Sequence, residues 1–355
     1  MSDKLATIYI WITILACVGA IAVMLAVGNP EKGESLPEEE KQEDTQGQPG
    51  FYAEVDDLAE NSLQVLLPAE TEKQHVTIES DYRNKTIRIQ IAKQPEGVLT
   101  EEYFYQNPVR YCAALQDIEI EEDENTITLW AEFASGFEWE MKFEEQAGER
   151  CLNIQLVRPR DKYEKIIVLD AGHGGTDDGN VIKGEDETII LSEKELAFSV
   201  VRKAGGLLEK EGVQVYYTRC DEDNPSDEER VSLANEVQAD MFISVHLDSS
   251  EDTSLYGMRT IYNETYFIPD FASADLAYLL LEKVAASTNE KAIGFEPASG
   301  ESVLIQNAMV PVTQLNIGYL SNRQEQKLLE REDYVQRIAE GICEAVLAGY
   351  EEIEK

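Results

Sequence analysis

The sequence predicts an α/β fold, with a mixed sheet flanked by helices, preceded by a small all-β domain and one transmembrane helix. Three observations lead to this prediction. From residue 165 onward, apolar strand patterns alternate with helical patterns; residues 51–160 carry mainly short alternating strand patterns; and residues 8–27 form an uncharged apolar run. Alternating strands and helices are typical of α/β layers, whereas successive short strands are typical of sandwiches and barrels.

The apolar run at residues 8–27 (IYIWITILACVGAIAVMLAV) is long enough to cross a bilayer as a helix, which needs about 20 residues. A cleaved signal peptide is the alternative, although the run exceeds a usual signal core and no clear small-residue cleavage site follows it. Lys4 precedes the run and acidic residues follow it. We therefore expect residues 1–7 in the cytoplasm and a single-pass cell-membrane protein with its C-terminal bulk outside.

Charge limits the class of partner. The chain has 70 acidic and 30 basic residues, which gives a formal net charge of −40. Such a charge repels phosphates, so the composition argues against nucleic acid and against an anionic lipid surface. Residues 28–50 are rich in Glu, Gln, Gly and Pro and predict an acidic, disordered linker.

Residues 51–160 are expected to form a β-rich accessory domain, either a small antiparallel sandwich or a barrel. Residues 76–80 and 85–91 alternate apolar and polar side chains around a short polar turn, as in a hairpin. His75 is the lone histidine of this region and fits a surface residue better than a ligand. The same alternation recurs at residues 126–133, 137–143 and 152–157.

The five cysteines show no C-x-x-C spacing, so they predict neither a disulfide framework nor a cysteine zinc site. Cys112 and Cys151 fall in the β-rich region and could pair in an oxidising compartment. Their spacing alone does not decide between a pair and two free thiols.

Residues 165–355 are expected to form the α/β domain, whose functional groups should gather where strands end. The first strand, 166–170, is a continuous apolar run, as expected of a strand buried on both faces. Further strands are expected at 213–219, 241–247, 258–263 and 311–320, and helices from 193 and at 229–238, 272–287 and 334–348.

Two of the three histidines of the chain stand at strand ends. His173 lies within residues 170–175 (DAGHGG), where glycines allow a tight turn, and His246 ends the strand 241–247. One interpretation is a pair of zinc ligands acting through neutral imidazole. The other is two unrelated polar residues at loop starts, because no local spacing code connects them.

Glu193 lies where a helix is expected to begin. Ser192 and Glu195 have the S-x-x-E spacing of a capping box, which places Glu193 in the first helical turn. A glutamate there is favoured by the helix dipole without any further role. Position alone therefore leaves open whether Glu193 is a ligand or only a first-turn residue.

Several segments together resemble the zinc-dependent N-acetylmuramoyl-L-alanine amidase family: DAGHGGTDDGN, SEKELAF, YTRCDED, ERVSLANEVQADMFISVH and GYLSNRQEQKLL, in that order over about residues 165–350. The resemblance implies one catalytic Zn²⁺ with His173, Glu193 and His246 as ligands. It also implies hydrolysis of the amide between N-acetylmuramic acid and L-alanine, with peptidoglycan muropeptides as partner. Two histidines and a carboxylate leave a fourth position for water.

The sequence departs from the family pattern at two positions. Asn316 stands where the family usually has the glutamate that serves as general acid/base, and an amide side chain cannot exchange a proton near neutral pH. Glu296 and Glu301 precede this strand and are candidates to replace that glutamate. Asp248 stands in S-V-H-L-D where S-x-H-x-N is frequent; it could orient His246 or cap the following turn.

Two functions of different classes follow. The first is an active, membrane-anchored N-acetylmuramoyl-L-alanine amidase, with activity in doubt because of Asn316. The second is a degenerate amidase-like domain that binds peptidoglycan or regulates another cell-wall hydrolase. An acidic α/β protein without metal is a remote third. Zinc content would separate the third from the others, and turnover would separate the first from the second.

Overall fold

The computed structural model of the protein describes residues 50–56, 58–95, 97–112, 115–146, 149–220, 222–265, 268–300 and 302–354. The expected cytoplasmic segment 1–7, the membrane helix 8–27 and all of the linker 28–50 except Gly50 lie outside these residues. Within the described ranges, no helix has the length and apolar character that crossing a membrane requires.

The β-rich region consists of two sheets that share one hydrophobic core. Its strands are β1 (Tyr52–Glu54), β2 (Ser62–Leu67), β3 (Val76–Asp81), β4 (Thr86–Ala92), β5 (Val109–Cys112), β6 (Leu115–Glu122), β7 (Thr126–Phe133), β8 (Glu138–Gln146) and β9 (Glu149–Val157), with η1 (Lys73–His75) and α2 (Glu101–Gln106) between them. One sheet has the order β1-β5-β2-β9-β8 and the other β3-β4-β7-β6. This arrangement is the sandwich alternative; it departs from a purely antiparallel one because β1 and β5 run parallel.

The alternating pattern produces the sandwich core. In β4, Ile87, Ile89 and Ile91 are buried, while the residues between them are half-exposed. Side chains alternate between the two faces of a strand, so these three isoleucines lie on one face. The predicted hairpin is present as antiparallel β3 and β4, and its turn is stabilised by Asp81 Oδ1, which accepts from the Asn84 backbone at 3.0 Å.

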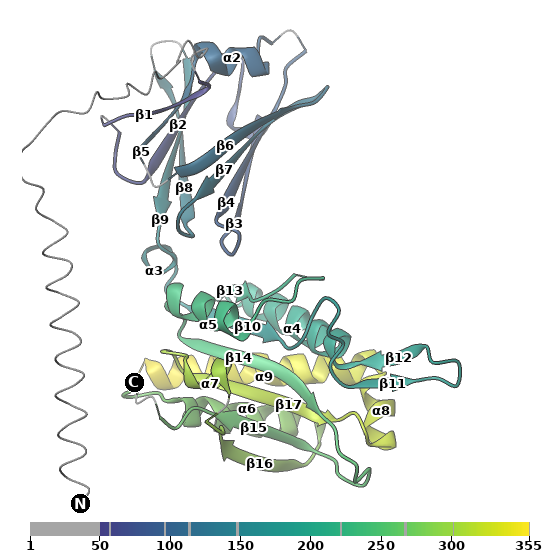
Figure 1. Ribbon diagram of the computed structural model, residues 1–355. Coiled ribbons are helices and arrows are strands. Elements are labelled where there is room, and N and C mark those ends of the chain that lie inside the picture. The colour runs from purple at the N-terminus through teal and green to yellow at the C-terminus, as the bar shows by residue number, and fades with distance from the viewer. Residues whose placement is uncertain are drawn as a thin grey trace, which may run out of the picture. The chain divides into compact units, whose positions relative to one another are not determined.

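The C-terminal region contains a six-stranded mixed sheet in the order β13-β10-β14-β17-β15-β16. Its strands are β10 (Ile166–Ala171), β13 (Gln214–Tyr217), β14 (Met241–Asp248), β15 (Met258–Tyr262), β16 (Ala292–Pro297) and β17 (Val312–Tyr319). The first four in spatial order are parallel, and β15 joins β17 antiparallel. The carboxyl ends of β10, β14 and β17 therefore meet at one edge (Figure 1).

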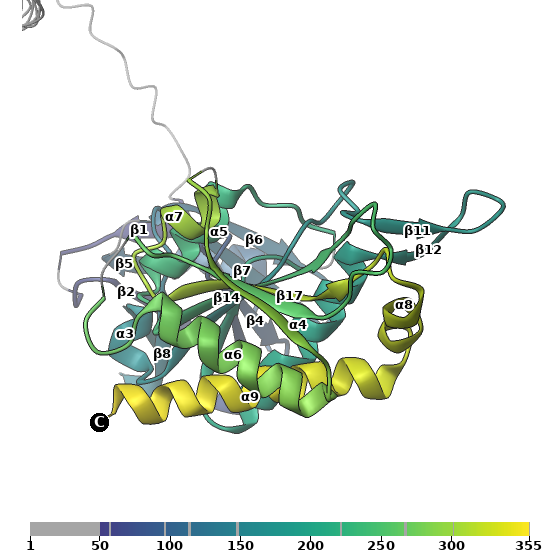
Figure 2. The same cartoon turned by 90° about the horizontal axis from the view of Figure 1, so that it is seen from below.

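Helices cover both faces of this sheet. The helices of this region are α3 (Pro159–Lys162), α4 (Glu193–Lys210), α5 (Asp227–Glu236), α6 (Ser273–Thr288), α7 (Val303–Gln306), α8 (Arg323–Leu329) and α9 (Glu332–Ile353). Side chains of α4, α6 and α9 pack on one face and those of α5 and α7 on the other, which gives two separate hydrophobic clusters. Figure 2 shows α6 and α9 side by side along the first face.

Most predicted elements of the α/β region are present within a few residues, and the mixed sheet flanked by helices is confirmed. The sequence patterns did not predict β16, α7, α8 or the hairpin of β11 (Val181–Lys183) and β12 (Ile189–Ser192). This hairpin projects from the sheet and leaves Ile189 and Ile190 exposed, so it lacks the buried face that makes a strand recognisable (Figure 2). In the described part of the chain, both Cys112 and Cys151 are free.

Candidate metal centre

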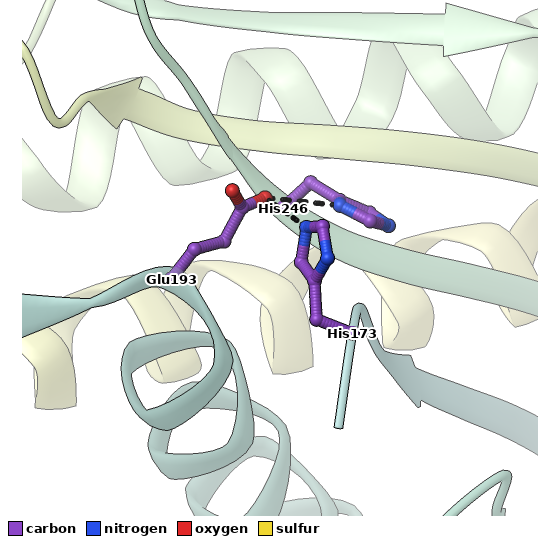
Figure 3. Close-up of side chains that lie close together, drawn as sticks. All are labelled: His173, Glu193 and His246. Atoms are coloured by element: carbon purple, nitrogen blue, oxygen red, sulfur yellow. Dashed lines mark hydrogen bonds and ion pairs between the residues drawn. The ribbon is translucent and has the colours of Figure 1, made fainter. Parts of the chain in front are cut away.

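The structure brings the three predicted ligands together (Figure 3). Glu193 Oε1 lies 3.1 Å from Nε2 of His173 and 3.0 Å from Nδ1 of His246. The three residues come from a loop, the start of a helix and a strand, and each offers one ligand atom within 4.8 Å of the others. This convergence favours the ligand interpretation over three unrelated polar residues.

Small residues make the approach of the two imidazoles possible. A Cβ built on Gly172 would lie 2.2 Å from Cε1 of His246, and one built on Gly179 would lie 2.6 Å from Cδ2 of His173. His173 itself has a φ of +62°, which is uncommon for a residue other than glycine and marks a tightly constrained loop. The loop turns tightly at His173, Gly174 and Gly175, which all have positive φ, as the glycines of this loop predicted; the room that Gly172 and Gly179 leave for the two rings was not predicted.

Glu193 is fixed at the start of α4 by several donors. Ser192 Oγ accepts from the Glu195 backbone at 3.3 Å and caps the helix, which is one of the two hydrogen bonds of the predicted capping box. The Glu193 side chain is buried; its Oε2 accepts from the Asn180 backbone at 3.0 Å and from Asn180 Nδ2 at 2.6 Å. Burial alone would raise the pKa of Glu193, but hydrogen bonds from both histidines and from backbone amides hold it below its usual range.

Asp177 orients the ring of His173. Its Oδ2 lies 2.8 Å from Nδ1 of His173, on the side of the ring away from Glu193. The hydrogen bond to Glu193, opposed by burial and reinforced by Asp177, raises the pKa of His173 to about 9. A carboxylate on one ring nitrogen leaves the other free to bind a metal, a common arrangement around metal-ligating histidines.

Sequence reasoning missed both Asp177 and Asn180, although they lie four and seven residues after His173. Asn180 reaches Glu193 and also donates to the Leu247 backbone carbonyl at 3.2 Å. A polar cluster directly after a glycine-rich histidine loop was the available signal. Which of its members would turn inward depended on the loop conformation, which the sequence does not specify.

A buried charge network holds the loop that carries His173. Asp170 is fully buried and accepts from Arg230, Ser244 and Thr218. Burial would raise the pKa of Asp170, but Arg230 and the two hydroxyls lower it below its ordinary value. Arg230 also donates to the backbone carbonyl of His173 at 2.8 Å, so the same guanidinium neutralises Asp170 and fixes the ligand loop.

Asn316 lies beside His246, within the sheet. It is the register partner of His246 in the parallel pair of β14 and β17, and it is 2% exposed. Its Nδ2 donates to Asp248 Oδ1 at 2.8 Å. Asp248 in turn binds Arg259 through two hydrogen bonds of 2.7 Å. Neither expected role of Asp248, orienting His246 or capping a turn, describes these contacts.

Of the two glutamates that could take the place of the family's catalytic glutamate, the structure describes only Glu296. Glu296 is in β16, and its Oε2 lies 3.6 Å from NH1 of Arg259; its side chain is mostly exposed. Glu301 lies outside the described residues. The contacts of Glu296 connect it to Arg259, while those of Asn316 connect it to Asp248.

Comparison with known proteins identifies the family. A family model described as N-acetylmuramoyl-L-alanine amidase matches residues 167–348, about half of the chain. The chain belongs to the N-acetylmuramoyl-L-alanine amidase family. The resemblance noted in the sequence is thereby confirmed.

Individual proteins are similar to about half of the chain. The chain is 29% identical over 191 residues to the Bacillus subtilis (strain 168) protein described as "Uncharacterized protein YqiI", covering 53% of this chain and 86% of that protein. It is 27% identical over 183 residues to N-acetylmuramoyl-L-alanine amidase CwlM of Mycobacterium tuberculosis (strain ATCC 25618 / H37Rv), covering 51% of this chain and 44% of CwlM. The match to LytC of Bacillus subtilis covers 36% of LytC, so the chain spans less than half of both curated amidases.

A solved structure is also similar. The catalytic domain of CwlV, an amidase from Bacillus (Paenibacillus) polymyxa var. colistinus, is 29% identical and aligns with a TM-score of 0.47. The alignment covers 53% of this chain and 98% of that domain.

In this member of the amidase family, a cavity of about 490 Å³ opens beside the two histidines. The start of α5 forms one wall and the His173 loop another, so a bound molecule would contact both. The lining residues include His173, His246, Asp177, Asp227, Glu229 and Leu304.

Proposed function

We propose that this protein is a zinc amidase that hydrolyses the amide between the lactyl group of N-acetylmuramic acid and L-alanine in peptidoglycan. The observation that carries the proposal is the convergence of His173, Glu193 and His246 beside a cavity, in a chain of the amidase family. Membership of the family supplies the substrate class, and the three side chains supply a place for the metal.

The donor set fits Zn²⁺. Two imidazole nitrogens and one carboxylate oxygen match catalytic zinc sites, which use three protein ligands and leave a further position open. A zinc ion bound there would lower the pKa of water and polarise the carbonyl of the scissile amide. His173, Glu193 and His246 are the residues that would hold it.

Neighbouring side chains fix the orientation of the proposed ligands. Asp177 fixes the ring of His173 with one nitrogen directed to Glu193, and Asn180 holds the second oxygen of Glu193. Side chains held in this way already have defined orientations, so a metal would have to replace only the hydrogen bonds between Glu193 and the two imidazoles and displace their shared proton. The cavity wall formed by α5 would receive the part of the muropeptide next to the scissile bond.

Asn316 supports the alternative, a weakly active or inactive domain that binds peptidoglycan or regulates another hydrolase. Hydrolysis needs a proton taken from water and a proton given to the leaving amine, and positioned groups contribute about 10²–10⁴ in rate. The Asn316 carboxamide can donate and accept hydrogen bonds but cannot exchange a proton near neutral pH. We therefore expect retained binding with turnover reduced by about 10²-fold or more.

Digestion of purified muropeptides by the full chain, followed by mass spectrometry, tests the proposal. An active amidase releases free stem peptides and lactyl-ended glycan, and His173→Ala abolishes this release. His75→Ala, at the lone histidine of the sandwich, is the matched control and should leave it unchanged. Zinc in the wild-type protein with muropeptide binding but no release at any enzyme concentration would favour the alternative.

Membrane attachment is a separate proposal. We infer from the apolar run at residues 8–27 that the chain is held at the cell membrane with its amidase region outside. Fractionation with N-terminal sequencing tests it. A mature protein beginning near Asn29 would show that the run is a cleaved signal peptide instead.

A further inference from the structure

Three neighbouring strands place His246, Asn316 and Arg259 in one row. Asn316 of β17 pairs with His246 of β14 on one side and with Arg259 of β15 on the other. Residues directly opposite on neighbouring strands point to the same face of a sheet, and such strands lie about 4.8 Å apart. Asn316 therefore stands between a proposed metal ligand and a guanidinium.

Both polar atoms of the Asn316 side chain have partners. Its Oδ1 accepts from Gln314 Nε2 at 2.8 Å, and its Nδ2 donates to Asp248 Oδ1 at 2.8 Å. An ionised carboxylate can only accept, so Asp248 requires the amide nitrogen on its side and thereby fixes which way the carboxamide points. The orientation of Asn316 is thus set by the charge of its neighbour.

Asp248 is itself held by Arg259. The guanidinium donates from Nε to Asp248 Oδ2 and from NH2 to Oδ1, each at 2.7 Å, which is the two-pronged geometry of a strong ion pair. Asp248 is mostly buried, and Arg259 is about one quarter exposed. One carboxylate, one carboxamide and one guanidinium are therefore joined by hydrogen bonds, and Arg259 also lies 3.6 Å from the mostly exposed Glu296.

We propose that Asp248, Asn316 and Arg259 are one coupled unit, in which Asp248 is the positioning residue that fixes the Asn316 carboxamide beside His246. The proposal deepens the proposed amidase function, on which it rests for the role of His246. It assigns to Asp248 a role in the sheet next to the metal centre, and it makes the residues acceptable at position 316 depend on the residue at position 248.

The coupling has a specific consequence for restoring a carboxylate at position 316. Asn316→Glu alone would give the group two carboxylates and one guanidinium, with the new carboxylate at a buried position, and would remove the donor that Asp248 requires. Adding Asp248→Asn returns the group to one carboxylate, one carboxamide and one guanidinium. Arg259 is the register partner of position 316, so it can neutralise a carboxylate there as well.

A double-mutant cycle tests the coupling in the full chain. The variants are Asn316→Glu, Asp248→Asn and the two together, with Asn316→Gln as the control for side-chain length without charge. Four quantities are measured: the melting temperature, the affinity for added Zn²⁺, and kcat and KM, each determined separately on a defined muropeptide. The first two readouts do not depend on turnover, so the cycle is informative even for an inactive protein.

We expect Asn316→Glu to lower the melting temperature by roughly 5–10 °C and to weaken zinc binding about 10-fold or more. For Asn316→Gln, the decrease in melting temperature and the decrease in zinc affinity should each be less than half of the decrease in Asn316→Glu. The double variant should recover most of both losses, and kcat should rise at least 10-fold above that of Asn316→Glu with KM changed less than threefold. A rise in kcat at nearly constant KM would distinguish a positioning role of Asp248 from a purely structural one, because a purely structural contact would not produce it.

Additive effects would overturn the coupling. If the double variant is as unstable and as weak in zinc binding as the sum of its single changes, Asp248 and Asn316 act independently. An Asn316→Glu variant with wild-type stability and zinc affinity would also overturn it. Recovery of stability and zinc affinity without any turnover would leave the coupling intact and count against the amidase activity instead.

Discussion

A Cβ atom built on Gly172 would lie 2.2 Å from Cε1 of His246, a separation that real Cβ atoms do not show. The contact joins the end of β10 to the end of β14, and the Gly172 backbone donates to the Val245 carbonyl at 3.0 Å across the same gap. The position of the His246 ring thus depends on the absence of a side chain at Gly172, which directly follows the neighbouring strand β10.

Replacing Gly172 by alanine should therefore weaken zinc binding strongly, although none of the three proposed ligands is replaced. The added methyl must push the His246 ring away from Glu193, and a ligand displaced by about 1 Å no longer completes the site. We expect zinc affinity to fall about 100-fold or more, measured by titration with a competing chelator.

Gly206→Ala is the matched control for this change. Gly206 lies within α4, and a Cβ there would meet nothing within 4 Å. Alanine should stabilise the helix by about 0.5–1 kcal/mol and leave zinc affinity unchanged. Normal zinc affinity in Gly172→Ala would show that the loop can move away without disturbing the centre.

Asn180→Ala should weaken the centre through Glu193. The change removes the 2.6 Å hydrogen bond from Asn180 Nδ2 to Glu193 Oε2 but keeps the backbone donor to the same oxygen. Loss of one partner of a ligand typically lowers metal affinity about 10–100-fold. Asn235→Ala, which removes a carboxamide that accepts from the Met309 backbone at 2.8 Å, should leave zinc affinity unchanged.

Arg230→Ala should destabilise the amidase region strongly. It would leave the fully buried Asp170 without its cation and would free the backbone carbonyl of His173. Removing one partner of a buried ion pair costs about 3–5 kcal/mol, which chemical denaturation would detect. Arg331→Ala, which breaks an exposed pair with Asp333, should leave the denaturation midpoint unchanged. Equal midpoints for wild type and Arg230→Ala would exclude Arg230 as a support of the ligand loop.

The sequence predicted the elements that bury one continuous face. Strand 166–170 and the helices beginning at Glu193 and near Glu332 have strong apolar patterns, and the structure contains them. The β11–β12 hairpin and β16 have no such pattern, because all of their side chains except that of Ser192 are half or fully exposed. Elements with a buried apolar face could therefore be predicted from the sequence. Strands that pair while their side chains remain exposed could not.

The residues of the candidate site were also only partly predictable from the sequence. His173 and His246 stand where strands end and Glu193 begins a helix, but these positions left other interpretations open, and the resemblance to the amidase family was needed to propose the three as one ligand set. Asp177 and Asn180 contact them only because the loop after His173 folds back through an uncommon φ at that residue. The pairing of Asp248 with Arg259 depends on strand order, since β15 joins the sheet next to β17, and strand order is not encoded in local spacing.

Glu325 should make the stability of the amidase region fall as pH rises. It is buried in α8, where Oε1 accepts from the Gly257 backbone at 3.0 Å and Oε2 from the Tyr319 backbone at 2.6 Å. Burial raises its pKa to about 7, against these two donors and with help from the nearby charges of Glu290 and Asp248. The ordinary value of a glutamate is 4.5.

Because the folded pKa is higher than the unfolded one, the folded state binds more protons between about pH 4.5 and pH 7. The stabilisation from protonated Glu325 is therefore complete below pH 4.5 and is lost as pH rises through 7, a change of about 3 kcal/mol. Glu325→Gln is neutral at every pH and should reduce this decline when unfolding free energies at pH 4.5 and 7.5 are compared with wild type. Glu344→Gln, on the exposed side of α9, should keep the wild-type decline. If Glu325→Gln loses as much stability as wild type between these two pH values, another buried group is responsible for the change.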